Sequence, residues 1–256
     1  MTAIAHQLQR SILIDAPPAT VFRYFTDSDR WAAWWGPGST IDARPGGRVF
    51  VRYPNGVEAA GEVVAVDPPA KITFTYGYLK DAPGPGESLV TITLEASARG
   101  GTRLQLTHDF AEAAHRDHHV QGWRYQLSVF ANVVANELHA DPAARVDAWF
   151  AVWSEPDGKA VDAALAHIAA PDVRVRDRFS CLAGAADVGE HIRASQRFMP
   201  GVRLQRDGAA HHCQGTVLAN WIATGPDGTE RSRGTNVFTL AGDGRIEAVT
   251  GFWRPV

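Results

Sequence analysis

Residues 120–134 read VQGWRYQLSVFANVV, and the spacing of their apolar side chains decides how the first half of the chain is interpreted. Apolar residues recur here every three or four positions, which is the period of one face of an α-helix. They are Val120, Trp123, Leu127, Phe130 and Val134. The helical period extends from about Glu112 to Leu138, so the sequence predicts one long helix with a single apolar stripe.

The residues before this helix predict a strand, a short helix and then a run of strands. Apolar and polar side chains alternate between Leu8 and Ile14, as in a half-buried strand. Asn55-Gly56 is typical of a two-residue hairpin turn, and Arg99-Gly100-Gly101 predicts the turn into the last strand. This order of elements indicates an α+β domain whose antiparallel sheet wraps around the final helix.

Asp141-Pro142 marks a domain boundary, because the residue before proline disfavours helix and proline favours a new first turn. The second half begins with helices and ends with strands, the reverse of the order in the first half. We therefore expect two different folds, at residues 1–138 and 141–256. The length of 256 residues suits two domains, since single domains commonly have about 100–150 residues.

Residues 173–179, VRVRDRF, are the most informative segment of the second half. The two-residue period of a strand divides their side chains between two faces. One face carries Val173, Val175, Asp177 and Phe179, and the other carries Arg174, Arg176 and Arg178. Unpaired arginines are too costly to bury, so we expect Asp177 to face the interior. A carboxylate there is a candidate general base, or else a group that orients a ligand or supports the structure.

Several motifs of the first half resemble one family closely. They are Ala16-Pro17-Pro18-Ala19-Thr20-Val21-Phe22, Thr26-Asp27, Trp34-Trp35-Gly36-Pro37 and His118-His119-Val120-Gln121-Gly122-Trp123. Over about residues 6–138, the chain resembles the START-related domains typified by the C-terminal domain of the activator of the ninety-kilodalton heat-shock chaperone's ATPase. The resemblance implies a helix-grip (START-like) fold with a cavity between the sheet and the long helix, and an apolar ligand in that cavity.

Six aromatic residues are candidates for the wall of such a cavity, because aromatic side chains bury a large area and their N–H and O–H groups orient a ligand. They are Trp34, Trp35, Tyr76, Tyr78, Trp123 and Phe130. The alternative is that these residues simply pack in the core. His115 and His119 would share a helix face, but no third metal ligand is identifiable, so we expect no metal.

The order of elements over about residues 141–256 resembles the nuclear transport factor 2-like (NTF2-like) superfamily, and within it the polyketide-cyclase and ketosteroid-isomerase-related proteins. The resemblance implies a cone-shaped α+β barrel in which Asp177 holds the position of the proton-abstracting aspartate. Where steroid isomerases have a tyrosine and a protonated acid, this chain has Trp149 and Asn236. Their N–H groups can donate hydrogen bonds to an oxyanion. For Asn236, a satisfied core amide is the alternative.

The composition narrows the function further. Hydrophobic residues make up 45% and charged residues 21%, and the net charge of −3 gives no attraction to nucleic acid or to an anionic membrane. No stretch approaches the roughly 18 apolar residues of a membrane span. The two cysteines, Cys181 and Cys213, lack metal-ligand spacing and indicate reduced thiols in a cytoplasmic protein, with a single disulfide as the alternative.

We expect no cofactor, because no phosphate-binding loop, dinucleotide-binding fingerprint or nucleophile elbow is present. The leading hypothesis is a protein that binds small apolar or aromatic metabolites in internal cavities. One alternative is an isomerase, cyclase or dehydratase that transfers a proton with Asp177. Another is an assembly or co-chaperone-like protein. We expect a homodimer through the second domain, to which its outward arginines or Trp221 contribute.

Overall fold

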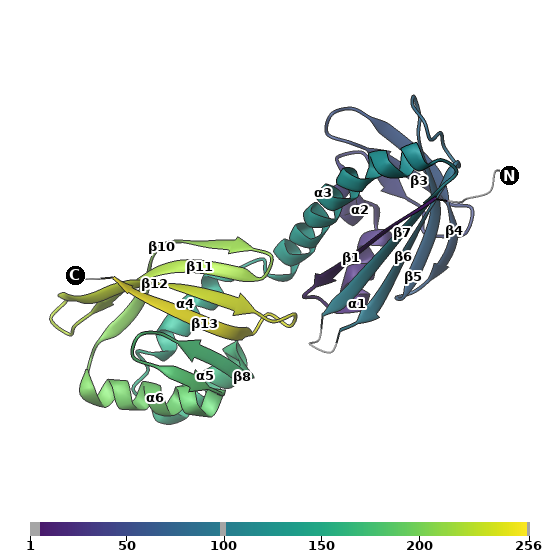
Figure 1. The fold of residues 1–256 in the computed structure, drawn as a ribbon. Coiled ribbons are helices and arrows are strands. Elements are labelled where there is room, and N and C mark those ends of the chain that lie inside the picture. Colours follow the sequence, from purple (N-terminus) through teal and green to yellow (C-terminus); the bar gives the residue numbers. More distant parts are fainter. Residues whose placement is uncertain (1–5, 98–100, 255–256) are drawn as a thin grey trace. The chain divides into compact units, whose positions relative to one another are not determined.

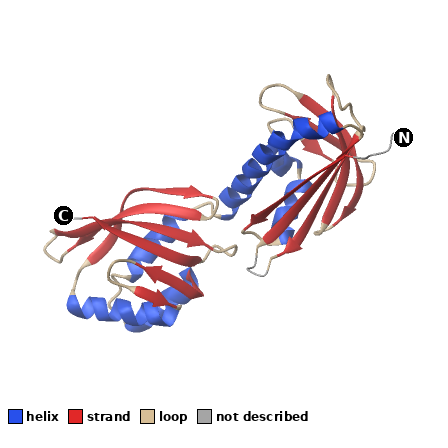
Figure 2. Cartoon of the chain, in the orientation of Figure 1, coloured by secondary structure: helices blue, strands red, loops and turns tan. Residues whose placement is uncertain are grey.

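The computed structural model describes residues 6–97 and 101–254, which form two compact units (Figure 1). The first unit ends at Ala135 and the second begins at Asn136. Each unit combines a β-sheet with helices (Figure 2), so the α+β class expected from the sequence is confirmed. Of the predicted turn at Arg99-Gly100-Gly101, only Gly101 lies within the described residues.

Within the described residues, the sheet of the first unit has seven strands in the order β1-β7-β6-β5-β4-β3-β2, all antiparallel to their neighbours. They are β1 (His6–Ile14), β2 (Thr40–Ile41), β3 (Arg48–Arg52), β4 (Glu58–Asp67), β5 (Lys71–Tyr78), β6 (Ser88–Ala96) and β7 (Thr102–Phe110). Asn55-Gly56 lies in the turn between β3 and β4. The prediction of a two-residue connection was wrong, because the connection takes in residues 53–57 and Tyr53 N–H bonds to the Val57 carbonyl.

The helical segments of the first unit are α1 (Pro18–Phe22), a short 3-10 segment (Arg23–Phe25), α2 (Ser28–Trp35) and α3 (Ala113–Leu138). Asp27 begins α2, because its carboxylate accepts the N–H groups of Asp29 and Arg30 at 2.9 and 3.1 Å. Both α2 and α3 pack on one face of the sheet, where Trp31 of α2 contacts Phe74 of β5 at 5.7 Å between ring centroids.

The long helix predicted from residues 120–134 is α3, which lies along the sheet of the first unit in Figure 1. Four of the five residues of the predicted stripe are buried, and Val120 is partly buried. Two polar residues, His119 and Gln126, complete the buried face of α3. The buried face of α3 is therefore not purely apolar, and the predicted apolar stripe contains only part of it.

The second unit has three helices and a six-stranded sheet among the described residues. The helices are α4 (Pro142–Val152), α5 (Gly158–Ile168) and α6 (Ala185–Phe198). The strands are β8 (Ala169–Arg176), β9 (Cys181–Ala183), β10 (Arg203–Cys213), β11 (Thr216–Thr224), β12 (Glu230–Leu240) and β13 (Ile246–Arg254). The sheet order is β10-β11-β12-β13-β8-β9, in which β8 and β13 are parallel. Asp141 caps α4 by accepting the Ala144 N–H at 2.8 Å, so the predicted helix start at Asp141-Pro142 is confirmed.

Strand β8 follows the predicted alternation as far as Arg176. Val173 and Val175 are buried, whereas Arg174 and Arg176 are exposed. The apolar side chains of this face join a core shared by the three helices and the sheet. The division into an inner apolar face and an outer basic face is therefore confirmed for residues 173–176.

The prediction that this strand continues to Phe179 was wrong. Asp177 comes directly after the last residue of β8, and its carboxylate accepts the Phe179 N–H at 2.7 Å. The Asp177 N–H in turn donates to the Ser180 carbonyl at 3.0 Å. An aspartate that bonds the backbone two residues ahead competes with strand pairing. The chain therefore turns at Asp177, and Phe179 is 65% exposed.

Two further observations concern partners. Trp221, which we expected at a subunit interface, is only 3% exposed and faces the core. No helix within residues 6–97 and 101–254 combines the length and apolar composition that crossing a membrane requires. Both cysteines are exposed and free.

Candidate functional site

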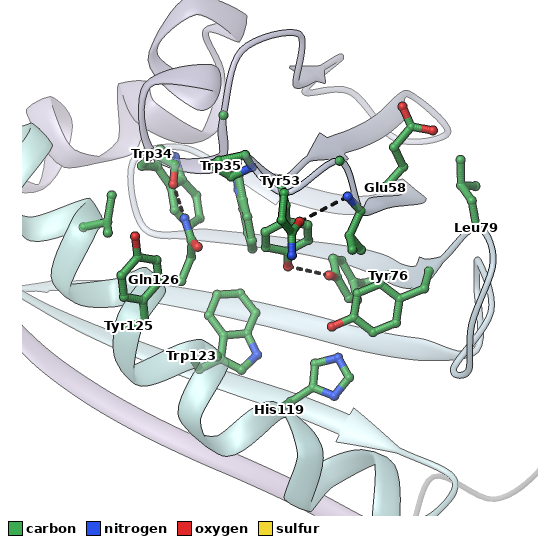
Figure 3. A pocket seen from close by; sticks show the side chains of 18 of the residues that line it. Trp34, Trp35, Tyr53, Glu58, Tyr76, Leu79, His119, Trp123, Tyr125 and Gln126 are labelled. Atoms are coloured by element: carbon green, nitrogen blue, oxygen red, sulfur yellow. Dashed lines mark hydrogen bonds between the residues drawn. The ribbon is translucent and has the colours of Figure 1, made fainter.

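The first unit contains a cavity of about 1160 Å³ between α2, α3 and the sheet. Its deep wall is mainly aromatic, as Figure 3 shows. The wall is formed by Trp34, Trp35, Tyr53, Tyr76, Tyr78, His119, Trp123, Tyr125 and Gln126, among others. Cavities of this size and lining are typical of sites for small molecules.

Five of the six aromatic residues predicted as a ligand wall line this cavity. They are Trp34, Trp35, Tyr76, Tyr78 and Trp123. Phe130 does not. It lies two turns further along α3 than Trp123 and packs in the core against Phe25 and Trp34, at 5.2 and 4.9 Å between ring centroids. For Phe130 the structure corrects the prediction, because the apolar stripe of α3 extends beyond the cavity.

Four of the nine wall residues named above were not predicted from the sequence. One of them, Tyr125, lies on the exposed side of α3. Tyr53 lies in the connection between β3 and β4. It continues the two-residue alternation of β3, and this alternation was the sequence signal that could have identified it. His119 and Gln126 come from α3. Both lie three or four positions from Trp123, so their helical spacing indicated that they share its buried face.

Three tyrosines lie together in the wall. The hydroxyl oxygens of Tyr53 and Tyr76 are 2.7 Å apart and share a hydrogen bond, and the Tyr78 ring packs edge-on against Tyr76 at 5.7 Å between centroids. Burial raises the pKa of all three phenols above the ordinary value. These groups are therefore uncharged near neutral pH, and they present the cavity with hydroxyl groups rather than with phenolates.

A buried histidine beneath the cavity fixes the orientation of Trp123. The Trp123 indole N–H donates to His108 Nδ1 at 2.8 Å. His108 Nε2 lies 2.8 Å from Ser88 Oγ, and the Ser88 hydroxyl donates to the Tyr76 carbonyl at 2.7 Å. Because Ser88 uses its single proton on that carbonyl, Nε2 of His108 must carry the proton that it shares with Ser88.

His108 is consequently held as a neutral imidazole with both nitrogens satisfied. Its side chain is fully buried. Burial, together with the nearby His119, lowers the pKa of His108 well below its usual range. A second proton on Nδ1 would also face the N–H of Trp123 rather than an acceptor. The network is therefore a rigid, uncharged support for one side of the cavity.

His119, in the same wall, has a buried ring nitrogen without a hydrogen-bond partner in the part of the chain that the structure describes. Its Nδ1 lies 2.7 Å from the His115 carbonyl, so Nδ1 carries the proton and Nε2 is unprotonated. The ring stacks on Tyr78 at 5.5 Å between centroids, and burial lowers the pKa of His119. Among the described residues, Nε2 of His119 and the indole nitrogen Nε1 of Trp35 are buried without a hydrogen-bond partner. Each such group costs about 1–3 kcal/mol.

Gln126 adds an acceptor on the opposite side of the wall. Its amide nitrogen donates to the Trp34 carbonyl, as the dashed line in Figure 3 shows. A carbonyl only accepts, so this bond fixes the amide orientation and turns the Gln126 oxygen away from Trp34. Within the described residues, no hydrogen bond to that oxygen is found, and it is not among the buried unpaired atoms. The oxygen therefore faces the cavity.

Charged and exposed apolar side chains lie at the rim. Glu58 is paired with Arg52 at 2.8 Å, and Lys80 and Asp81 are exposed. Three of the large apolar side chains that are exposed to solvent also belong to this rim. They are Val57, Leu79 and Tyr125, at 42%, 45% and 69% exposure. The cavity is thus uncharged at depth, and its mouth carries both charged and apolar side chains.

The structure brings together two of the three site residues predicted in the second unit. A side chain placed at Gly251 would come within 3.1 Å of both Asn236 Oδ1 and Asp177 Cβ, so both residues border this glycine. Asn236 Oδ1 accepts the Trp221 indole N–H at 2.9 Å. Trp149 lies elsewhere, buried against Trp153 and Phe238 at 6.2 and 6.3 Å between ring centroids. Its contacts are those of a core residue.

Metal binding finds little support in the side chains. Within residues 6–97 and 101–254, no group of three or more histidine, cysteine, aspartate or glutamate side chains is placed to hold a metal ion.

Comparison with known proteins gives a family match for the first unit. The family model described as activator of Hsp90 ATPase homolog 1-like protein matches residues 15–135. This range contains every residue of the cavity wall discussed above. No curated protein matches the chain.

Several solved structures are similar to parts of the chain. A putative isomerase of the SnoaL-like family from Agrobacterium tumefaciens is 24% identical, covers 46% of this chain and 99% of its own, and has a TM-score of 0.43. Protein Ms6760 from Mycobacterium smegmatis is 26% identical, covers 53% and 91%, and has a TM-score of 0.45. The Aha1 dimer from Colwellia psychrerythraea is 17% identical, covers 51% and 96%, and also has a TM-score of 0.45.

Proposed function

We propose that the first unit binds an uncharged, largely aromatic small molecule in the cavity between α2, α3 and the sheet. The observation that carries this proposal is a cavity of about 1160 Å³ with an aromatic wall and exposed apolar side chains at its rim. Aromatic walls bind flat apolar ligands through area burial and ring contacts. The side chains are held in place before binding by the network of Trp123, His108 and Ser88, which lowers the entropy cost of binding.

The test blocks the cavity without removing any core side chain. Gly122 lines the cavity on an exposed face of α3, and a Cβ there would meet nothing within 4 Å. We expect Gly122→Trp to weaken binding of the uncharged dye Nile red at least about tenfold, measured by its fluorescence. The matched control is Ser128→Trp, on the exposed face of the same helix. No Nile red binding to the unaltered protein, or equal binding to both variants, contradicts the proposal.

The second candidate function is proton transfer by Asp177 in the second unit. Asp177 and Asn236 border the same glycine, Gly251. Asn236 accepts the Trp221 N–H through its amide oxygen, so its amide N–H₂ takes no part in that bond. A half-buried carboxylate beside an amide donor combines the groups that a general base and an oxyanion donor require. Trp149, buried in the core, has no part in this candidate.

The proton-transfer candidate is tested with deuterium exchange at the acidic C–H of 2-tetralone, followed by NMR. Asp177→Asn is expected to abolish catalysed exchange. Asp172→Asn is the control, because Asp172 is exposed and lies on β8, the strand that ends just before Asp177. If the unaltered protein and both variants exchange the ketone at one rate, Asp177 is not a base.

We also infer that the second unit pairs with a second copy of the chain through the outer face of its sheet. Leu218 of β11 and Phe252 of β13 are 41% and 56% exposed. Strand register places Leu218 opposite Val237 and Phe252 opposite Thr235, so these side chains share one face. An exposed apolar patch on a sheet is typical of an interface between subunits.

A further inference from the structure

The polar atoms of the cavity wall form a pattern that a ligand has to match. The hydroxyl groups of Tyr53 and Tyr76 have two protons, and one hydrogen bond joins the two groups. One O–H donor is therefore left over, whichever of the two hydroxyls donates.

The acceptor of the wall is equally defined. The Gln126 amide oxygen faces the cavity because its nitrogen is tied to the Trp34 carbonyl. The wall thus offers a donor on the side of the tyrosines and an acceptor on α3. A ligand satisfies both only if it carries an acceptor and a donor of its own.

The charge of the wall limits the ligand further. The charged residues Glu58, Lys80 and Asp81 lie at the rim, and Glu58 is already paired with Arg52. In the deep wall, the phenols and the two histidines are neutral for the geometric reasons given above. An anionic or cationic ligand would lose its hydration there without gaining a partner of opposite charge.

We infer that the ligand of this cavity is an uncharged aromatic ketone that also carries a hydroxyl group. This inference rests on the proposed function of the first unit. The ketone oxygen accepts the left-over O–H of Tyr53 or Tyr76, and the ligand hydroxyl donates to the Gln126 amide oxygen. The aromatic skeleton lies against the tryptophan and tyrosine rings.

The experiment uses the full chain and four compounds that share one diaryl skeleton. They are meta-hydroxybenzophenone, benzophenone, meta-benzylphenol and meta-benzoylbenzoate. The first has both groups, the second lacks the donor, the third lacks the acceptor, and the fourth is charged. Affinities are measured by isothermal titration calorimetry. We expect meta-hydroxybenzophenone to bind about tenfold more tightly than either compound with one group, and the carboxylate to bind most weakly.

The outcomes distinguish a failure of this inference from a failure of the proposed function. If the three neutral compounds bind equally, or if the carboxylate binds best, the ketone and hydroxyl pattern is wrong while the cavity still binds ligands. If none of the four binds but Nile red does, the inference is again wrong. If neither the four compounds nor Nile red bind, the proposed function itself is wrong.

One variant tests whether Gln126 is the acceptor of the ligand hydroxyl. Gln126→Leu is expected to remove the tenfold preference for meta-hydroxybenzophenone over benzophenone. Ser128→Ala, two residues further along α3 and exposed, is the control that should keep this preference. A preference that survives Gln126→Leu in a folded protein shows that Gln126 does not take the ligand hydroxyl. If Gln126→Leu does not fold, the four compounds still decide the inference on the unaltered chain.

Discussion

Ser88 shows how a single hydroxyl group organises the base of the cavity. It accepts from His108 Nε2 and donates to the Tyr76 carbonyl, and it is only 2% exposed. We expect Ser88→Ala to lower the free energy of unfolding by about 1–3 kcal/mol, because the His108 N–H loses its acceptor in a buried site. Urea unfolding followed by circular dichroism measures this change.

The matched control for Ser88 is Ser128→Ala on the exposed face of α3. Its hydroxyl donates to the Arg124 carbonyl in the same helix, and its removal is expected to change stability by less than about 0.5 kcal/mol. Equal effects of the two substitutions would mean that the histidine network contributes no stability.

His139 makes the stability of the second unit depend on pH. Burial lowers the pKa of His139 to about 4, with smaller effects from His212 and Arg145. An unfolded histidine has a pKa of about 6.5. Between these values the unfolded chain binds a proton that the folded chain does not, so stability is highest above about pH 6.5 and falls as the pH drops toward 4.

We therefore expect His139→Phe to reduce the loss of stability on acidification. The phenyl ring keeps the ring contact with His212, whose centroid is 5.4 Å away, but it does not titrate. The measurement is the urea midpoint at about pH 7.5 and about pH 5 for both proteins. Some pH dependence should remain, because burial also lowers the pKa of His108. An unchanged pH dependence in His139→Phe contradicts the prediction.

At the scale of elements, the end of α2 requires a glycine beside the cavity. Gly36 has φ of 139°, and a Cβ there would lie 2.4 Å from the Arg52 carbonyl oxygen. Backbone atoms of β3 cannot move aside cheaply, so Gly36→Ala is expected to cost about 1–3 kcal/mol of unfolding free energy. Urea unfolding measures this cost.

Gly122 provides the opposite case within α3. A Cβ at this position meets nothing within 4 Å, and alanine restricts the unfolded chain more than glycine does. Gly122→Ala is therefore expected to stabilise the protein by about 0.5–1 kcal/mol. If Gly36→Ala and Gly122→Ala change stability in the same direction, the prediction is wrong. The space around each Cβ would then not determine the effect.

The sequence was sufficient for elements whose pattern is local. The apolar stripe of α3 and the alternation of residues 173–176 are both visible because each residue is placed by its neighbours. The end of β8 was missed because strand period alone does not reveal that Asp177 bonds the Phe179 N–H. An aspartate followed two residues later by a backbone donor is a turn signal that competes with the period.

The cavity depends on long-range arrangement and was less predictable. Its wall combines residues from α2, β5, α3 and the connection after β3, and no local pattern states how these elements converge. The aromatic content and the family resemblance identified five wall residues. Tyr53 and Gln126 were missed because one lies outside a strand and the other is polar within an apolar stripe. Their roles follow only from their partners, Tyr76 and Trp34.

At the scale of the whole molecule, the exposed apolar face of the second unit predicts the state of assembly. Leu218 and Phe252 are 41% and 56% exposed on neighbouring rungs of one sheet face. In a two-fold dimer each such residue would be buried against the same patch of its partner. We expect the full chain to be a dimer at micromolar concentration, and Phe252→Arg to make it a monomer, because an arginine in the centre of the patch would be desolvated beside its own copy.

Light scattering after size-exclusion chromatography measures the mass in solution, and an exposed apolar residue of the first unit supplies the control. Leu13 of β1 is 59% exposed, so it tests whether any large apolar residue on a sheet affects assembly. Leu13→Arg should leave the dimer intact. A monomer in the unaltered chain removes the basis for this interface. If the dimer survives Phe252→Arg but is lost in Leu13→Arg, the contact between subunits lies on the first unit instead. The exposed side chain of Leu13 on β1 would then be part of that contact.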